Sequence, residues 1–169
     1  MPSLFARLRP AAPVSSAAYD AAVNVARSKH WYLAGQVPDT MDGRFALLAT
    51  VVAMVTLRLE AAGGAGTAAS VGLTEAFIAD MDAQMREQGF DATLSKQVRS
   101  LVGSLASRVD QWRRLLAGEG DWGSVIRRGV YRDSPQSEAV VDYATERLRA
   151  LWAALGAASL DDVLAGRFA

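Results

Sequence analysis

Apolar residues recur along most of the chain at alternating spacings of three and four. This spacing places them on one side of an α-helix, so the pattern predicts helices separated by short polar or glycine-containing turns. No stretch has the strict alternation of a half-buried strand, and we expect an all-α fold. The clearest stripes are Leu73, Phe77, Met81 and Met85; Leu94, Val98, Leu101, Leu105, Val109, Trp112 and Leu116; and Val140, Ala144, Leu148, Leu151 and Leu155.

The stretch from Phe45 to Leu57 contains no charged residue and is apolar in nearly every direction around a helix. A helix of this kind is covered on most sides by other helices. We therefore predict a single globular domain of about five to six helices, packed around one apolar central helix at about 42–60. The run is too short to span a bilayer, which requires about 20 apolar residues.

Polar residues just before this run predict where the central helix begins. Thr40 or Asp39 can accept a backbone N–H as the N-cap, and Asp42 would lie in the first turn, where the helix dipole favours a negative charge. Arg44 must either extend into solvent or pair with a carboxylate. A carboxylate on a neighbouring helix is a candidate partner.

The domain organisation follows from composition along the chain. We expect residues 1–14, which contain three prolines, to form a flexible leader, and residues 15–169 to form a single helical domain. Residues 61–72 contain four glycines and no charge, and they predict a Gly/Ala-rich surface loop.

Composition excludes several classes of function. The 169 residues include 18 Lys and Arg against 18 Asp and Glu, so no overall field would hold the protein on DNA. Cysteine is absent, and His30 is the single histidine, which argues against a zinc site or a histidine-dependent nucleophile. His30 continues an apolar stripe, and we expect a core histidine bonded to a backbone carbonyl rather than a functional one.

The sequence Asp80-Met81-Asp82 is the most enzyme-like motif. Two carboxylates separated by one residue point in nearly opposite directions on a helix, so they cannot share a metal ion. Asp82 lies four residues before Arg86, the spacing of a surface ion pair. We predict no catalytic, cofactor-binding or metal-binding residues, and a protein that binds or assembles others is favoured over an enzyme.

Several stretches taken together resemble the ubiquinol-cytochrome c chaperone family in its alphaproteobacterial form. The resemblance covers about residues 19–168 and departs at 105–108, where Leu-Ala-Ser-Arg replaces an expected aromatic-Gly-Arg step, and at Trp112, near the place of a tyrosine. It rests on Val37-Pro38-Asp39-Thr40, Asp42-Gly43-Arg44-Phe45, Leu57-Arg58-Leu59, Leu73-Thr74, Phe77, Asp80-Met81-Asp82, Arg86-Glu87, Gly89, Lys96, Val98-Arg99, Arg108, Val130-Tyr131 and Leu164-Ala165-Gly166-Arg167.

The resemblance implies a non-enzymatic assembly chaperone without a cofactor. Its client would be newly made cytochrome b of the ubiquinol-cytochrome c reductase, with the ribosome and a small companion protein as further candidate partners. The expected location is the cytoplasm, peripheral to the inner membrane at most. Matched charged positions off the core stripes form the hypothetical partner-binding surface: Arg44, Asp80, Asp82, Arg86, Lys96 and Arg99.

An alternative function has no link to respiration. A non-catalytic scaffold or regulatory domain could bind another helical protein through an exposed apolar groove. Selective loss of one respiratory complex would distinguish the chaperone from this alternative, and a metal or cofactor in purified protein would favour an enzyme instead.

Overall fold

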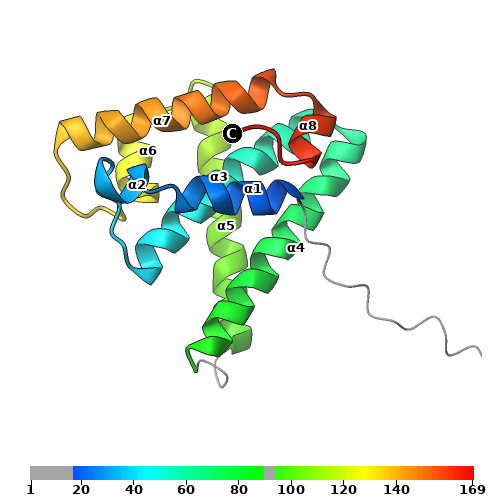
Figure 1. The fold of residues 1–169 in the computed structure, drawn as a ribbon, viewed down its shortest axis with the longest axis horizontal. Coiled ribbons are helices and arrows are strands. Elements are labelled where there is room, and N and C mark those ends of the chain that lie inside the picture. Colours follow the sequence, from blue (N-terminus) through cyan, green and yellow to red (C-terminus); the bar gives the residue numbers. More distant parts are fainter. Residues whose placement is uncertain (1–16, 90–93) are drawn as a thin grey trace, which may run out of the picture.

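Within residues 17–89 and 94–169, which are those described by the computed structural model, every regular element is an α-helix (Figure 1). This confirms the predicted fold class. Eight helices are present in the described part of the chain, and six of them have eight residues or more. They are α1 (Ala17–Arg27), α2 (His30–Leu33), α3 (Met41–Ala61), α4 (Gly64–Glu87), α5 (Leu94–Leu116), α6 (Trp122–Gly129), α7 (Glu138–Ala157) and α8 (Leu160–Leu164).

Helix α3 is the centre of the fold, as its composition predicted. Every residue from 46 to 57 is buried. The helix packs against α1, α4, α5, α6, α7 and α8, which together exclude water from all sides of residues 46–57. Because six helices pack against α3, this one helix supplies the common core.

The prediction of a surface loop at 61–72 is wrong. Ala61 ends α3, a tight turn follows with φ values of 63° and 43° at Gly63 and Gly64, and residues 64–72 are already helical. A Cβ atom on Gly66 would lie 2.2 Å from the carbonyl oxygen of Leu59. The small residues therefore let α4 approach the end of α3 closely, and this tertiary contact outweighs the low helix propensity of glycine.

Helix starts follow the capping rules at several positions. Thr40 caps α3 by accepting the Gly43 N–H at 3.1 Å, and Asp121 and Ser159 cap α6 and α8 in the same way. Ser134 and Pro135 fit the start of another helix in the sequence, but α7 begins later. Ser137 is its N-cap, because Arg132 and Asp133 adopt positive φ values and turn the chain first.

The apolar stripe that His30 continues is divided between two helices, with Tyr19, Val23 and Ala26 on α1 and His30 and Leu33 on α2. Helix α1 ends at Arg27, and the Val25 carbonyl then accepts both the Ser28 N–H at 3.2 Å and the Trp31 indole N–H at 2.9 Å. His30 starts α2 and is half-buried. Its Nδ1 lies 3.2 Å from the Tyr143 hydroxyl of α7, so a side chain and not the expected backbone carbonyl is its partner.

His30 should make stability depend on pH. Burial and the Arg147 cation lower the pKa of the imidazole from its ordinary 6.5. The unfolded chain then binds this proton more readily, so the free energy of unfolding should fall as the pH drops below 6.5. Urea titrations of the wild type and of His30→Gln between about pH 8 and about pH 5 test this. If the free energy of unfolding depended on pH equally in the two proteins, the assignment of this pH dependence to His30 would be contradicted.

The last turns of α4 and the first turns of α5 extend together beyond the other helices (Figure 1). The opposite end of the fold is closed by α7 and α8 across the end of α3. Arg58 joins α3 to the end of α7, because its guanidinium donates to the carbonyl oxygens of Leu155 at 2.8 Å and Ala158 at 2.7 Å. No helix in the described part of the chain combines the length and apolar character needed to cross a membrane.

Candidate functional site

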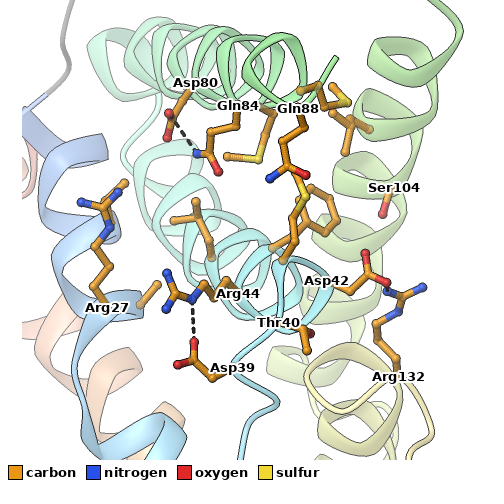
Figure 2. A pocket seen from close by; sticks show the side chains of 18 of the residues that line it. Arg27, Asp39, Thr40, Asp42, Arg44, Asp80, Gln84, Gln88, Ser104 and Arg132 are labelled. Carbon is orange, nitrogen blue, oxygen red and sulfur yellow. Dashed lines mark hydrogen bonds and ion pairs between the residues drawn. The ribbon is translucent and has the colours of Figure 1, made fainter. Parts of the chain in front are cut away.

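A cleft of about 1070 Å³ opens between α1, the start of α3, the end of α4 and the middle of α5. Figure 2 shows Gln84 and Gln88 pointing into it from α4, with Arg27 on the α1 side and Ser104 on the α5 side. A volume of this order suits a large ligand or a peptide segment. The cleft therefore exists because the end of α1, the end of α4 and the middle of α5 diverge around the first turns of α3.

The floor of the cleft is apolar. Met81 and Met85 come from the buried stripe of α4 and retain only 7% and 9% exposure, while Phe45 and Leu48 rise from α3 and Leu101 from α5. Phe45 packs against the fully buried Phe77 with ring centroids 5.8 Å apart. Methionine side chains adapt to ligands of different shape, so this floor can accommodate varied apolar groups.

Two exposed hydrophobic residues also line the cleft. Leu33 at the end of α2 is 75% exposed, and Met41 at the start of α3 is 41% exposed. Large apolar side chains that are exposed to solvent next to a cavity are typical of a binding site. Val71 and Val102 are exposed as well, but neither lines the cleft.

Arg44 is on the wall of the cleft, and the structure identifies its partner. Its Nε lies 2.6 Å from Asp39 Oδ1, and its guanidinium is 6.0 Å from the Tyr32 ring centroid. The suggested partner on a neighbouring helix is thus wrong, because the turn before Thr40 brings Asp39 back beside the first turn of α3. The hydrogen bond from Arg44 lowers the pKa of the Asp39 carboxyl.

Asp80 and Asp82 have separate partners, as helix geometry predicted. Asp80 faces the cleft and accepts hydrogen bonds from the Tyr19 hydroxyl at 2.6 Å and from Gln84 Nε2 at 3.1 Å. Burial, and then the bond to Asp80, raise the pKa of Tyr19. Asp82 forms the predicted ion pair with Arg86 at 2.9 Å. Asp80 therefore joins α1 to α4 and orients Gln84 on the wall.

The six charged residues singled out in the sequence fall into two groups. Arg44 and Asp80 line the cleft. The other four lie outside it on the extended ends of two helices: Asp82 and Arg86 on α4, and Lys96 and Arg99 on α5. The structure thus brings two of them into one cavity and leaves four on an adjoining surface.

Sequence reasoning did not single out Arg108 as a site residue. This half-buried side chain lines the cleft from α5, and its Nη1 donates to Thr50 Oγ1 at 3.2 Å and to the Gly129 carbonyl oxygen. Arg132 lies near it and pairs with Asp42 at 2.7 Å. The signal was present in the spacing, because Arg108 follows the stripe residue Leu105 by three positions and so borders the buried face of α5.

Comparisons with known proteins agree with the resemblance seen in the sequence. A family model described as "Ubiquinol-cytochrome C chaperone" matches residues 33–169. The crystal structure of the Cbp3 homolog from Brucella abortus is similar in fold, with a TM-score of 0.71 and 23% sequence identity, over 90% of this chain and 86% of that chain. Among curated protein sequences, none matches. Because the family match extends over most of the chain, the protein belongs to the ubiquinol-cytochrome c chaperone family.

Proposed function

We propose that this protein is a non-catalytic assembly chaperone that binds newly synthesised cytochrome b and supports biogenesis of the ubiquinol-cytochrome c reductase. The observation that carries the proposal, within a chain of this family, is the cleft with its apolar floor and with Leu33 and Met41 exposed beside it. A membrane protein presents apolar segments to water before it is inserted. A cleft of this kind can cover such a segment.

The composition of the cleft suits transient binding. Its floor offers Met81 and Met85, which can repack around different apolar side chains, while charged and amide groups on its walls remain in contact with water. A chaperone must release its client, and a partly polar site binds an apolar segment less tightly than a closed apolar pocket does. The adjoining surface of Asp82, Arg86, Lys96 and Arg99 provides a second contact, with the client or with its ribosome.

The first test is whether loss of the gene removes cytochrome b. We expect membranes of a deletion strain to lose the b-type heme signal of this complex in a reduced-minus-oxidised spectrum, with other respiratory complexes intact. A plasmid carrying the gene should restore the signal. An unchanged spectrum, under growth that requires the complex, would favour the alternative of a helical scaffold unrelated to respiration.

The second test concerns the cleft itself. Leu33→Glu and Met41→Glu place a charge on exposed positions of the cleft, so they should leave the fold intact and reduce co-purified cytochrome b about tenfold. Val71→Glu is the matched control, because Val71 is 56% exposed on α4 and does not line the cleft. Equal recovery of cytochrome b with all three variants would remove the cleft from the proposal.

Charge reversals separate the cleft from the adjoining surface. Asp82→Lys and Arg99→Glu should weaken client or ribosome association while leaving the cleft unchanged. If both variants retain cytochrome b and ribosomes at wild-type levels, this surface has no part in partner binding.

A further inference from the structure

Arg27, Lys29 and Arg108 line the cleft without an ion pair among the described residues, and Arg108 differs from the other two because it is half-buried and held by neutral groups. Among the described residues, no carboxylate lies within ion-pair distance of its guanidinium. Its Nη1 is held by Thr50 and Gly129, both of them neutral, and its Nε is buried without any hydrogen-bond partner in the described part of the chain. Its Nη2 has no hydrogen-bond partner among the described residues and is not buried, so the positive charge can be approached from the cleft through this atom.

The neighbouring carboxylates cannot form an ion pair with Arg108 without losing their own partners. Three carboxylates line the cleft in the described part of the chain: Asp39 is paired with Arg44, Asp42 with Arg132, and Asp80 accepts from Tyr19 and Gln84. Burial, and then the nearby Arg132, lower the pKa of Arg108 to about 10. The guanidinium therefore stays charged at neutral pH, and its surroundings do not neutralise it.

A half-buried, charged guanidinium whose Nη2 lacks a partner among the described residues is suited to an external carboxylate. Because Nη1 is already engaged and Nε is buried, Nη2 is the donor that can meet a carboxylate in the cleft, and such charge-assisted hydrogen bonds are stronger where water is excluded. The backbone carbonyl of Gly129 and the hydroxyl of Thr50 fix the side chain in place, so little conformational entropy is lost on binding. A small anion alone would leave most of the cleft and its apolar floor empty.

We propose that Arg108 binds the carboxylate of an acidic side chain within an apolar segment of the client, which lies along the floor of the cleft. The inference rests on the proposed function and names the feature of the client that the cleft recognises. The floor residues Leu48, Met85 and Leu101 receive the apolar side chains, and Arg108 receives the Asp or Glu between them. Charge complementarity thus selects one register of the segment.

A matched pair of peptides tests this with purified full-length protein. The probe is a short Leu- and Ala-rich peptide, fluorescently labelled, blocked at both ends and carrying one central Glu; its counterpart carries Gln at that position. Fluorescence anisotropy should give about tenfold tighter binding of the Glu peptide, as expected for a charge-assisted hydrogen bond in a shielded site. Equal affinity for the two peptides, or binding of neither, would overturn the proposal.

Two variants locate the effect at Arg108. Arg108→Gln should abolish the preference for Glu while retaining binding of the Gln peptide. Because this change could also disturb the contacts to Thr50 and Gly129, Ser104→Glu provides an independent test. Ser104 lines the cleft (Figure 2) and lies one turn before Arg108 on α5. A Glu at this position can pair with Arg108 within the helix. This pair should raise the melting temperature and abolish the preference for the Glu peptide.

Ser107→Glu is the matched control for the introduced charge, because Ser107 is exposed on α5 and does not line the cleft. It should keep the preference for the Glu peptide. Loss of the preference in Ser107→Glu, or its survival in Ser104→Glu, would contradict the assignment of the carboxylate site to Arg108. The assignment would also be contradicted if inorganic phosphate competed with the peptides while the Glu and Gln peptides bound equally. If cytochrome b co-purifies with the wild type but the two peptides bind equally, this inference alone is refuted. Failure of the wild type to retain cytochrome b would refute the proposed function.

Discussion

Replacing Gly43 with alanine is expected to destabilise the protein by about 3 kcal/mol, the upper part of the range for an overpacked core position. Gly43 is buried in the first turn of α3, and an added Cβ would lie 2.0 Å from the carbonyl oxygen of Pro38. This neighbour is backbone, so it cannot move without displacing the turn that places Asp39 and Thr40. The same turn forms part of the cleft, so the variant should also weaken binding of apolar peptides.

Urea denaturation followed by circular dichroism measures this effect. Gly72→Ala is the control, because Gly72 is also helical but an added Cβ would meet nothing within 4 Å. That variant should be more stable by about 0.5 to 1 kcal/mol, since alanine is the better helix former. Similar stabilities for the two variants would show that the approach of Pro38 to Gly43 is not a constraint.

Truncation of Phe77 to alanine is expected to lower the free energy of unfolding by about 4 kcal/mol, a usual cost for a fully buried phenylalanine. Phe77 has no exposed surface and supports Phe45 from beneath the cleft, with the two ring planes tilted by 41°. The cavity left by the ring lies between α3 and α4, and it allows Phe45 to move away from the floor.

The control is Val71→Ala on the same helix. Val71 is 56% exposed, so its truncation should change the free energy of unfolding by less than about 0.5 kcal/mol. Chemical denaturation of both variants compares them directly. A loss below about 2 kcal/mol for Phe77→Ala would mean that the surrounding helices collapse into the space, contrary to the tight packing of this core.

The helices that the sequence predicted well are those with a clear apolar stripe. The bounds of α5 at Leu94–Leu116 agree with the predicted stripe, and the centre of the fold is α3 as expected. Thr40 caps α3 where local capping chemistry placed the helix start, and Asp121 and Ser159 cap α6 and α8 by the same chemistry. These features depend on residues only a few positions apart, and single-sequence patterns contain such information.

The errors share a physical cause. The glycines of 63–72 were interpreted through their low helix propensity, whereas the close approach of α4 to Leu59 requires a residue without a side chain at Gly66. Ser134 and Pro135 form a reasonable helix start by themselves, but the turn at Arg132 and Asp133 delays α7. In each case a contact or turn outside the local pattern decided the structure.

The candidate site was less accessible from the sequence than the fold. Arg44 and Asp80 were selected and do line the cleft, but nothing in the spacing indicated that Tyr19, 61 residues from Asp80, would bond to it. Arg108 and Thr50 are likewise 58 residues apart. Which charges are paired and which remain available depends on the packing of α1, α3, α4 and α5 against one another.

The sequence by itself determined that this protein is a bundle of α-helices around one apolar helix and that it has the residue pattern of its family. It could do so because helical periodicity, capping and burial of an uncharged run act within one segment of the chain. Only the tertiary structure decided that the helix ends diverge into a cleft, that Met81 and Met85 form its floor, and that Arg108 is held there without a carboxylate partner among the described residues. Those features arise where distant segments meet, and the energy of a buried charge depends on everything packed around it.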